Sequence, residues 1–419
     1  MALSVLSRLG DCVVVVAVGD HRGIVRLRQL KSYLRYLLVV LFIIPLSGLG
    51  TDITVPSLPA ISNAFDITTT LAQTSVAIYI FGYGIGQLII GPISDHYGRK
   101  PIVILGFLLY IMLITVFLLF PTVRSLMVSR FLQGLVLAAA IVPCRSILSD
   151  VATGDLYKKL INYMTISWSF GVVFSPVIGG YLQHYLGWQY NFYFLLAYSS
   201  CALLAFVCIY KETHFPEASF SIRVAGQNYL GLLSDIQFVS SLFLLGLLSS
   251  LIILFNIVAP FLVQVQLELT SISYGNLAFL IGVAWLLGNI ASRLFIASPM
   301  KVRLQYAILG LLLSSVFMVI VSQTMPLSRL SLGLGTWFVV FFGGFIFPIF
   351  VSDNLARYRN MASTSNALLF AGIWVVCSGA TSLASHLKDI NQIPLSFALL
   401  SAAVTVALIY RFFLRGKGA

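Results

Sequence analysis

The chain has 419 residues, of which 59% are hydrophobic and 9% charged, whereas soluble domains carry about 25% charged residues. This composition excludes a water-soluble globular fold, because too few polar side chains are available to cover its surface. The five cysteines show no CxxC spacing, so we expect no disulfide framework, metal site or cofactor. The formal charge of +12 could indicate nucleic-acid binding, but basic residues of membrane proteins usually mark cytoplasmic loops.

The apolar residues form long stretches that predict membrane-spanning helices. A helix of about 20 residues crosses a hydrocarbon core of roughly 30 Å, and lipid tolerates no unpaired backbone. We predict an all-α membrane protein with twelve spanning helices, at 36–60, 73–93, 101–121, 124–149, 160–183, 190–210, 238–265, 273–297, 304–324, 328–352, 362–385 and 394–414.

The predicted helices divide into two similar halves. Six lie in 36–210 and six in 236–419, with the polar stretch 211–235 between them as a cytoplasmic linker. Near-equal halves predict a duplicated transporter fold of two six-helix bundles. The apolar run Val13–Val18 is too short to span, so we interpret residues 1–35 as a cytoplasmic extension.

Basic residues are distributed unevenly between the two sides of the membrane. If the N-terminus is cytoplasmic, inner segments hold 20 of the 25 Lys and Arg, and outer loops hold Arg124, Arg329 and Lys388. Arg130 and Arg145 lie within the fourth predicted helix. We therefore predict that both termini are cytoplasmic. The same count explains the net positive charge of the chain without nucleic-acid binding.

A short loop rich in glycine and charge follows the second predicted helix, Gly91-Pro92-Ile93-Ser94-Asp95-His96-Tyr97-Gly98-Arg99-Lys100-Pro101. It resembles the signature GxLxDxxGRK of the major facilitator superfamily. Glycine permits a tight turn and close helix approach, and Asp95 can accept hydrogen bonds from Arg99. We expect a latch on the cytoplasmic side formed by Gly91, Asp95, Gly98 and Arg99. The resemblance adds Asp150 as a further acidic partner, for which a solvated helix end is the alternative.

Two motifs place opposite charges inside the membrane. Gly50-Thr51-Asp52-Ile53-Thr54-Val55-Pro56-Ser57-Leu58-Pro59 is similar to the DxxxPxLP pattern of drug/proton antiporters, and Arg130-Phe131-Leu132-Gln133-Gly134 to the RxxQG motif. An acid in a spanning helix costs several kcal/mol unless it is paired or protonated. Asp52 and Arg130 should lie at similar heights, about 9 to 15 Å below the outer surface. The resemblance implies proton coupling, whereas a carboxylate in water at a helix end is the alternative for Asp52.

The fifth predicted helix contains Gly171-Val172-Val173-Phe174-Ser175-Pro176-Val177-Ile178-Gly179-Gly180, which resembles the antiporter motif GxxxGPxxGG with Ser175 replacing one glycine. Small residues let helices approach closely, and proline bends the helix. For Gly171, Pro176, Gly179 and Gly180 the resemblance implies a role in exchange, and it favours export over uptake. A general packing stripe is the alternative.

Aromatic and amide side chains are candidates for a substrate cavity. Tyr79, Tyr83 and Gln87 follow one another at four-residue spacing, which places them on one helix face. The further candidates are Trp168, Phe255 and Asn256, with Trp285 and Trp374 as weaker ones. For each of them ordinary helix packing is the alternative.

The resemblance covers residues 36–215 and is greatest to the Bcr/CflA branch of drug-exporting antiporters. The second half is similar in layout, but its counterpart loop Gly288–Arg293 lacks the acid. The resemblance implies a monomeric secondary transporter of a bacterial inner membrane that exports small amphipathic, drug-like compounds in exchange for protons. The alternatives are a carrier of the same fold for one metabolite or siderophore, and a membrane sensor that transports nothing.

Enzyme motifs are missing from the sequence. It has no GxxxxGK[ST] phosphate loop, no HExxH and no GxSxG pattern. We therefore expect neither enzymatic chemistry nor transport driven by ATP within this chain.

Overall fold

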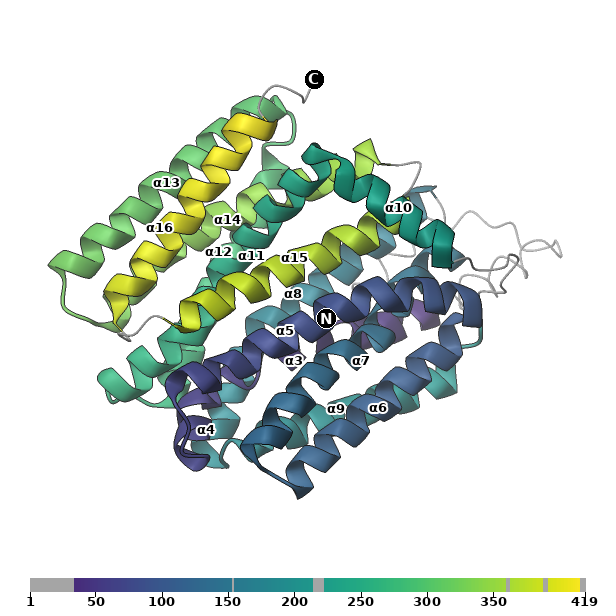
Figure 1. Cartoon of the computed structure of the whole chain (residues 1–419), viewed down its shortest axis with the longest axis horizontal. Coiled ribbons are helices and arrows are strands. Elements are labelled where there is room, and N and C mark those ends of the chain that lie inside the picture. The colour runs from purple at the N-terminus through teal and green to yellow at the C-terminus, as the bar shows by residue number, and fades with distance from the viewer. Residues whose placement is uncertain (1–33, 153, 214–221, 359–361, 387–390, 415–419) are drawn as a thin grey trace, which may run out of the picture.

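The computed structural model describes residues 34–152, 154–213, 222–358, 362–386 and 391–414 (Figure 1). Most of the expected extension, including Val13–Val18, lies outside these residues. Within these described ranges twelve helical segments are long and apolar enough to span a membrane, which confirms the predicted fold class. They are Leu34–Ala64, Thr69–Tyr97, Arg99–Leu119, Val123–Val151, Tyr163–Tyr185, Gln189–Ile209, Ile236–Gln266, Ser271–Leu294, Met300–Thr324, Arg329–Asn354, Thr364–Ser385 and Gln392–Leu414.

The spans form two bundles that lie side by side (Figure 1). The first bundle contains α3 (Leu46–Asp52), η1 (Val55–Ser57), α4 (Leu58–Ala64), α5 (Thr69–Tyr97), α6 (Arg99–Leu119), α7 (Val123–Val151), α8 (Gly154–Tyr185) and α9 (Gln189–Ile209). The second contains α11 (Ile236–Phe261), η2 (Leu262–Gln266), α12 (Ser271–Leu294), α13 (Met300–Thr324), α14 (Arg329–Arg357), α15 (Ala362–Ser385), α16 (Gln392–Ile409) and η4 (Tyr410–Leu414).

The boundary between the bundles is formed mainly by two pairs of helices, α5 with α15 and α8 with α12. Helices α6 and α9 lie on the outer side of the first bundle, and α13 and α16 on that of the second (Figure 1). Leu105 of α6 and Leu313 of α13 are exposed, as expected for side chains that contact lipid. The arrangement therefore keeps polar side chains of the inner helices away from lipid.

Capping side chains define one end of the molecule, which we call the Thr122 end. There the residues directly before α5, α7, α12 and α14 are Thr68, Thr122, Thr270 and Ser328, whose hydroxyls accept hydrogen bonds from backbone amides of the first turn. The other end, where α5 gives way to α6, we call the Arg99 end.

The first span is broken in its middle, at Asp52. Pro56 has no amide hydrogen to donate to the Asp52 carbonyl, and its ring would clash with that carbonyl in a regular helix. Accordingly α3 ends at Asp52, and the short helix η1 begins three residues later at Val55. The break places a carboxylate at a helix end that is nevertheless buried inside the bundle.

The connection between the second and third spans is shorter than expected. Instead of a loop from Gly91, helix α5 continues through Pro92 to Tyr97, and α6 starts at Arg99. Gly98 alone separates the helices, with φ of 91°, a left-handed conformation that glycine adopts without strain. At Gly91 an added Cβ would meet nothing within 4 Å, so the expected close approach is not found there.

The stretch expected as a linker contains a helix, α10 (Ile222–Ser234), which lies across the Arg99 end (Figure 1). The Tyr229 hydroxyl donates a 3.4 Å hydrogen bond to the Leu88 carbonyl of α5. Asp235 then caps α11 and accepts a hydrogen bond of 2.5 Å from the Tyr358 hydroxyl. Partial burial raises the pKa of Asp235, but hydrogen bonds from Tyr358 and from backbone amides outweigh it and hold that pKa below its ordinary value.

Candidate functional site

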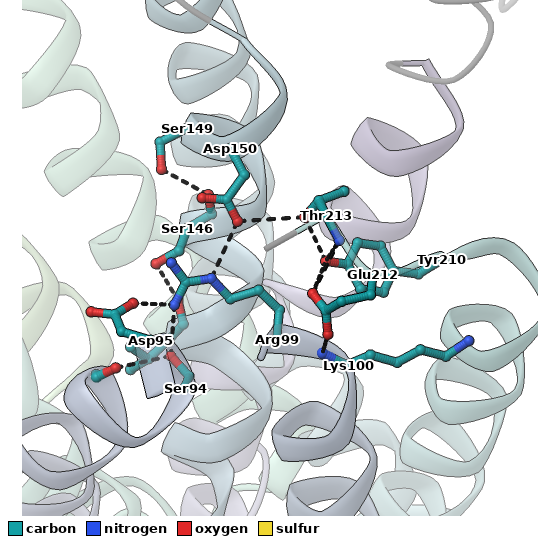
Figure 2. Close-up of polar contacts among 12 residues, drawn as sticks. Ser94, Asp95, Arg99, Lys100, Ser146, Ser149, Asp150, Tyr210, Glu212 and Thr213 are labelled. Carbon is teal, nitrogen blue, oxygen red and sulfur yellow. Dashed lines mark hydrogen bonds and ion pairs between the residues drawn. The ribbon is translucent and has the colours of Figure 1, made fainter. Parts of the chain in front are cut away.

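Arg99 joins the ends of three helices. Its guanidinium donates hydrogen bonds to Asp95 and Ser94 of α5, the latter at 2.9 Å, and to Asp150 of α7 at 3.2 Å (Figure 2). The Arg99 side chain is 6% exposed, so the cation is buried between its two carboxylates. Such charge-assisted contacts stabilise this packing of α5, α6 and α7. Asp150 is thus a partner of Arg99, although it lies at an exposed helix end.

Two residues after the sixth span extend this network, and our reading of the sequence did not identify them. Glu212 accepts a hydrogen bond of 2.8 Å from the Lys100 amide, in the first turn of α6 (Figure 2). The Thr213 hydroxyl donates to Asp150 at 3.4 Å. An acid near a helix N-terminus satisfies free amides and the helix dipole. An acid directly after an apolar span was the signal that could have revealed Glu212.

Asp52 is 3% exposed and lies at the boundary between the bundles. Its Oδ1 accepts a hydrogen bond of 3.2 Å from the Asn256 side chain of α11, in the other bundle. The Tyr274 hydroxyl of α12 donates to the Asn256 side-chain oxygen at 3.5 Å and to its backbone carbonyl at 3.3 Å. This contact orients the amide so that its NH₂ group faces the carboxylate. The acid of the first half is therefore held by residues of the second.

Arg130 lies at the height of Asp52, as expected from helix rise. Its guanidinium donates to the Gly50 carbonyl at 3.1 Å and to the Thr54 hydroxyl at 3.5 Å, two residues to either side of Asp52. It also stacks on the ring of Tyr79, 4.1 Å from the centroid. Among the described residues no ion pair joins Arg130 to Asp52. The two charges are close neighbours that do not touch.

The glycines of α8 permit two different close contacts. An added Cβ at Gly171 would clash with the Pro45 carbonyl, and one at Gly179 with the Ile53 carbonyl, both in the first span. At Gly180 it would lie 2.7 Å from the Ser271 carbonyl of α12, across the boundary. Gly171 and Gly179 thus let α8 pack closely against the first span of its own bundle, whereas Gly180 lets it pack closely against α12 of the other bundle.

Pro176 also lies at this boundary, because a Cβ added to Gly275 of α12 would lie 2.6 Å from its carbonyl oxygen. Ser271 donates to the Gly180 carbonyl at 2.8 Å, and Gln264 to the Pro56 carbonyl at 2.8 Å. These contacts hold the bundles together near the Thr122 end. The structure is therefore closed at that end.

The cavity candidates fall into two groups. Tyr79, Tyr83 and Gln87 are buried on one face of α5, and Tyr83 meets Trp374 of α15 with ring centroids 5.7 Å apart. Phe255 stacks on Tyr274, beside Asn256. Tyr83, Trp374 and Asn256 thus contact the opposite bundle, whereas Tyr79 lies inside the first bundle against Arg130.

Two candidates lie elsewhere. Trp285 packs on Phe347 inside the second bundle, with centroids 5.5 Å apart. Trp168 is half-buried and packs against the apolar core, with no side-chain hydrogen bond to a described residue. Within the described part of the chain no group of three His, Cys, Asp or Glu side chains could hold a metal ion.

The sequence is similar to known transporters over most of its length. Residues 40–381 match the family described as Major Facilitator Superfamily. The chain is 23% identical over 395 residues to a bicyclomycin resistance protein homolog of Haemophilus influenzae, covering 93% of this chain and 98% of that protein. It is 28% identical over 248 residues to the chloramphenicol resistance protein CraA of Acinetobacter baumannii, covering 58% and 59%.

The fold is also similar to a solved structure, the partially occluded inward-open xylose transporter XylE from E. coli. The TM-score is 0.74 over 93% of this chain and 99% of that one, at 14% sequence identity.

Proposed function

The chain belongs to the major facilitator superfamily, and we propose that it is a secondary active transporter that exports small amphipathic compounds in exchange for protons. The observation that carries this proposal is the carboxylate of Asp52, buried at the boundary between two bundles and bonded to Asn256 across it. A buried acid at a moving boundary can take up a proton on one side of the membrane and release it on the other.

In this cycle the bundles 36–210 and 236–419 rock against each other, and 211–235 links them. When they part at the Thr122 end, Asp52 loses its contact with Asn256 and gains access to protons. Protonation removes its charge, and substrate leaves outward. When the bundles part at the Arg99 end, the proton is released inward. Arg130, which is hydrogen-bonded to Gly50 and Thr54 on either side of Asp52, stabilises the carboxylate.

The Arg99 end is the cytoplasmic end in this proposal. The excess of Lys and Arg in the segments that connect the helices there supports this orientation. The Arg99 network biases which end is open and does not touch the substrate. Both termini, with residues 1–35, then lie in the cytoplasm, and the chain works as a monomer in a bacterial inner membrane.

The direction of transport is supported by two observations. The Gly180 contact between α8 and α12 belongs to a motif similar to that of exchangers. Two relatives, at 23% and 28% identity, are named for resistance to bicyclomycin and chloramphenicol. We therefore favour export of drug-like compounds over transport of one metabolite or siderophore and over a sensor function.

The proposal is tested on purified full-length protein in liposomes whose lumen is one pH unit more acidic than the medium. Such a gradient supplies about 1.4 kcal/mol per proton, enough for about tenfold accumulation. We expect chloramphenicol and several unrelated dyes to accumulate, and a protonophore to abolish the effect. Accumulation of a single metabolite would identify the specific carrier, and no accumulation of any compound would identify the sensor.

A further inference from the structure

A second cation lies inside the membrane, and none of the described acids lies beside it. Arg145 is half-buried in α7, six residues before that helix ends. Its guanidinium donates a long hydrogen bond of 3.4 Å to Gln87 Oε1 and lies 5.5 Å from the ring centre of Phe370. In the described ranges no carboxylate oxygen comes within 4 Å of it. A charge within a spanning segment is costly and usually marks a binding site or pathway.

Three buried hydrogen-bonding groups close to Arg145 lack partners in the described structure, namely Tyr83 Oη, Gln87 Nε2 and Trp374 Nε1. The amide nitrogen and the indole nitrogen can only donate. The Ser47 hydroxyl lies beside the Tyr83 oxygen and gives its own proton to the Ile44 carbonyl, so it can accept a hydrogen bond from Tyr83 but cannot donate one. The cluster is therefore rich in donors and poor in acceptors. A buried donor without an acceptor is unfavourable, so a missing acceptor is implied.

These groups come from both bundles. Tyr83 and Gln87 are four residues apart on α5, as are Phe370 and Trp374 on α15, so each pair shares one helix face. The two faces meet where the rings of Tyr83 and Trp374 pack edge to face. Gly84 keeps the backbones close, because a Cβ there would lie 3.1 Å from the Ala371 carbonyl. In the proposed cycle this boundary opens at the Arg99 end.

We propose that Arg145, Gln87, Tyr83 and Trp374 form a subsite for a carboxylate of the transported compound, with Phe370 beside its apolar part. This inference rests on the proposed transport function and defines its substrate class. The planar guanidinium offers paired donors that match a carboxylate, and the amide, phenol and indole supply the remaining hydrogen bonds. The same uncompensated charge repels organic cations, so the site selects aromatic acids over amines.

The test is equilibrium binding of three matched probes to the purified full chain in lipid nanodiscs: 2-naphthoate, its methyl ester, and the cation 2-(aminomethyl)naphthalene. We expect 2-naphthoate to bind most tightly and the amine most weakly. Arg145→Gln should raise the Kd of 2-naphthoate on the order of 10- to 100-fold and leave that of the ester within about threefold. Arg124→Gln is the matched control, because Arg124 is an exposed cation at the start of the same helix.

Tyr83→Phe removes one hydroxyl with little change of volume and should raise the Kd of 2-naphthoate by about three- to tenfold. It serves as the test if Arg145→Gln does not fold. The inference is overturned if the amine binds as tightly as 2-naphthoate, or if neither variant weakens 2-naphthoate more than the ester.

These outcomes are separate from those of the transport assay. Binding of 2-naphthoate through Arg145 without proton exchange would retain the subsite and reject the proposed function. Proton-driven transport of dyes by a protein that does not prefer 2-naphthoate would retain the proposed function and reject the subsite.

Discussion

Replacing Gly180 with alanine should open the Thr122 end of the molecule. The added Cβ would lie 2.7 Å from the Ser271 carbonyl, nearer than the 3.0 Å below which real Cβ contacts essentially never occur. Its neighbour is backbone and cannot rotate away. The same two residues share the 2.8 Å hydrogen bond from Ser271 Oγ to the Gly180 carbonyl. The substitution therefore forces α8 and α12 apart where they hold the bundles together.

The magnitude follows from the cost of overpacking, about 1 to 3 kcal/mol for an added group in a close-packed contact. That cost applies to the arrangement closed at the Thr122 end and disappears once the helices part there. The ratio of open to closed molecules should therefore rise on the order of 10- to 100-fold.

The assay is a distance measurement between spin labels at Asn63 and Val265. Both residues are exposed and line a small cavity between the bundles at the Thr122 end. The labels are attached to introduced cysteines in a chain whose five native cysteines have been replaced. We expect longer distances in Gly180→Ala and unchanged ones in Gly379→Ala, because a Cβ at Gly379 meets nothing within 4 Å. Unchanged distances in a folded Gly180→Ala protein would refute the reasoning.

Three further predictions concern the contacts that hold the helices. Arg99→Ala should slow transport at least tenfold while the equilibrium Kd for substrate stays within about threefold, because the latch biases populations; lost binding in folded protein would contradict the latch. Asn256→Leu removes the hydrogen bond from Asn256 to Asp52, worth about 1 kcal/mol, and should lower the transport rate about fivefold. An unchanged rate would show that Asp52 needs no partner across the boundary. Because the pKa of Asp235 is depressed in the folded protein, its contribution to stability is present above pH 4 and lost as the pH falls further. Thermal unfolding from pH 6 to 3 should show a smaller decrease in Asp235→Asn than in the native chain, and equal decreases would exclude this role.

The sequence predicted the helices well because lipid allows few alternatives. Spans of apolar residues, and the heights of Asp52 and Arg130, follow from the helix rise alone. Helix ends were less accurate. The Gly91 segment looked like a loop because it carries proline, glycine and charge, yet it remains helical until Gly98. Only Gly98 adopts a backbone conformation that requires glycine.

Contacts between distant segments could not be predicted from spacing. Asn256 was a cavity candidate, but its bond to Asp52 joins residues 204 positions apart and depends on how the bundles pack. Arg145 was counted as a charge in a helix, and its donor-rich surroundings appear only when α5, α7 and α15 are assembled. Glu212 looked like part of a polar linker until the structure brought it to the first turn of α6.

The central claim is that Asp52 carries the coupled proton. Its most direct measurement is proton release from the purified full chain in weakly buffered detergent solution, followed with a pH indicator as a transported compound is added. The native chain should release protons, Asp52→Asn should release none, and Asp66→Asn should release as many as the native chain, because Asp66 is an exposed acid in a turn that asparagine tolerates. Undiminished release from folded Asp52→Asn protein would contradict the account.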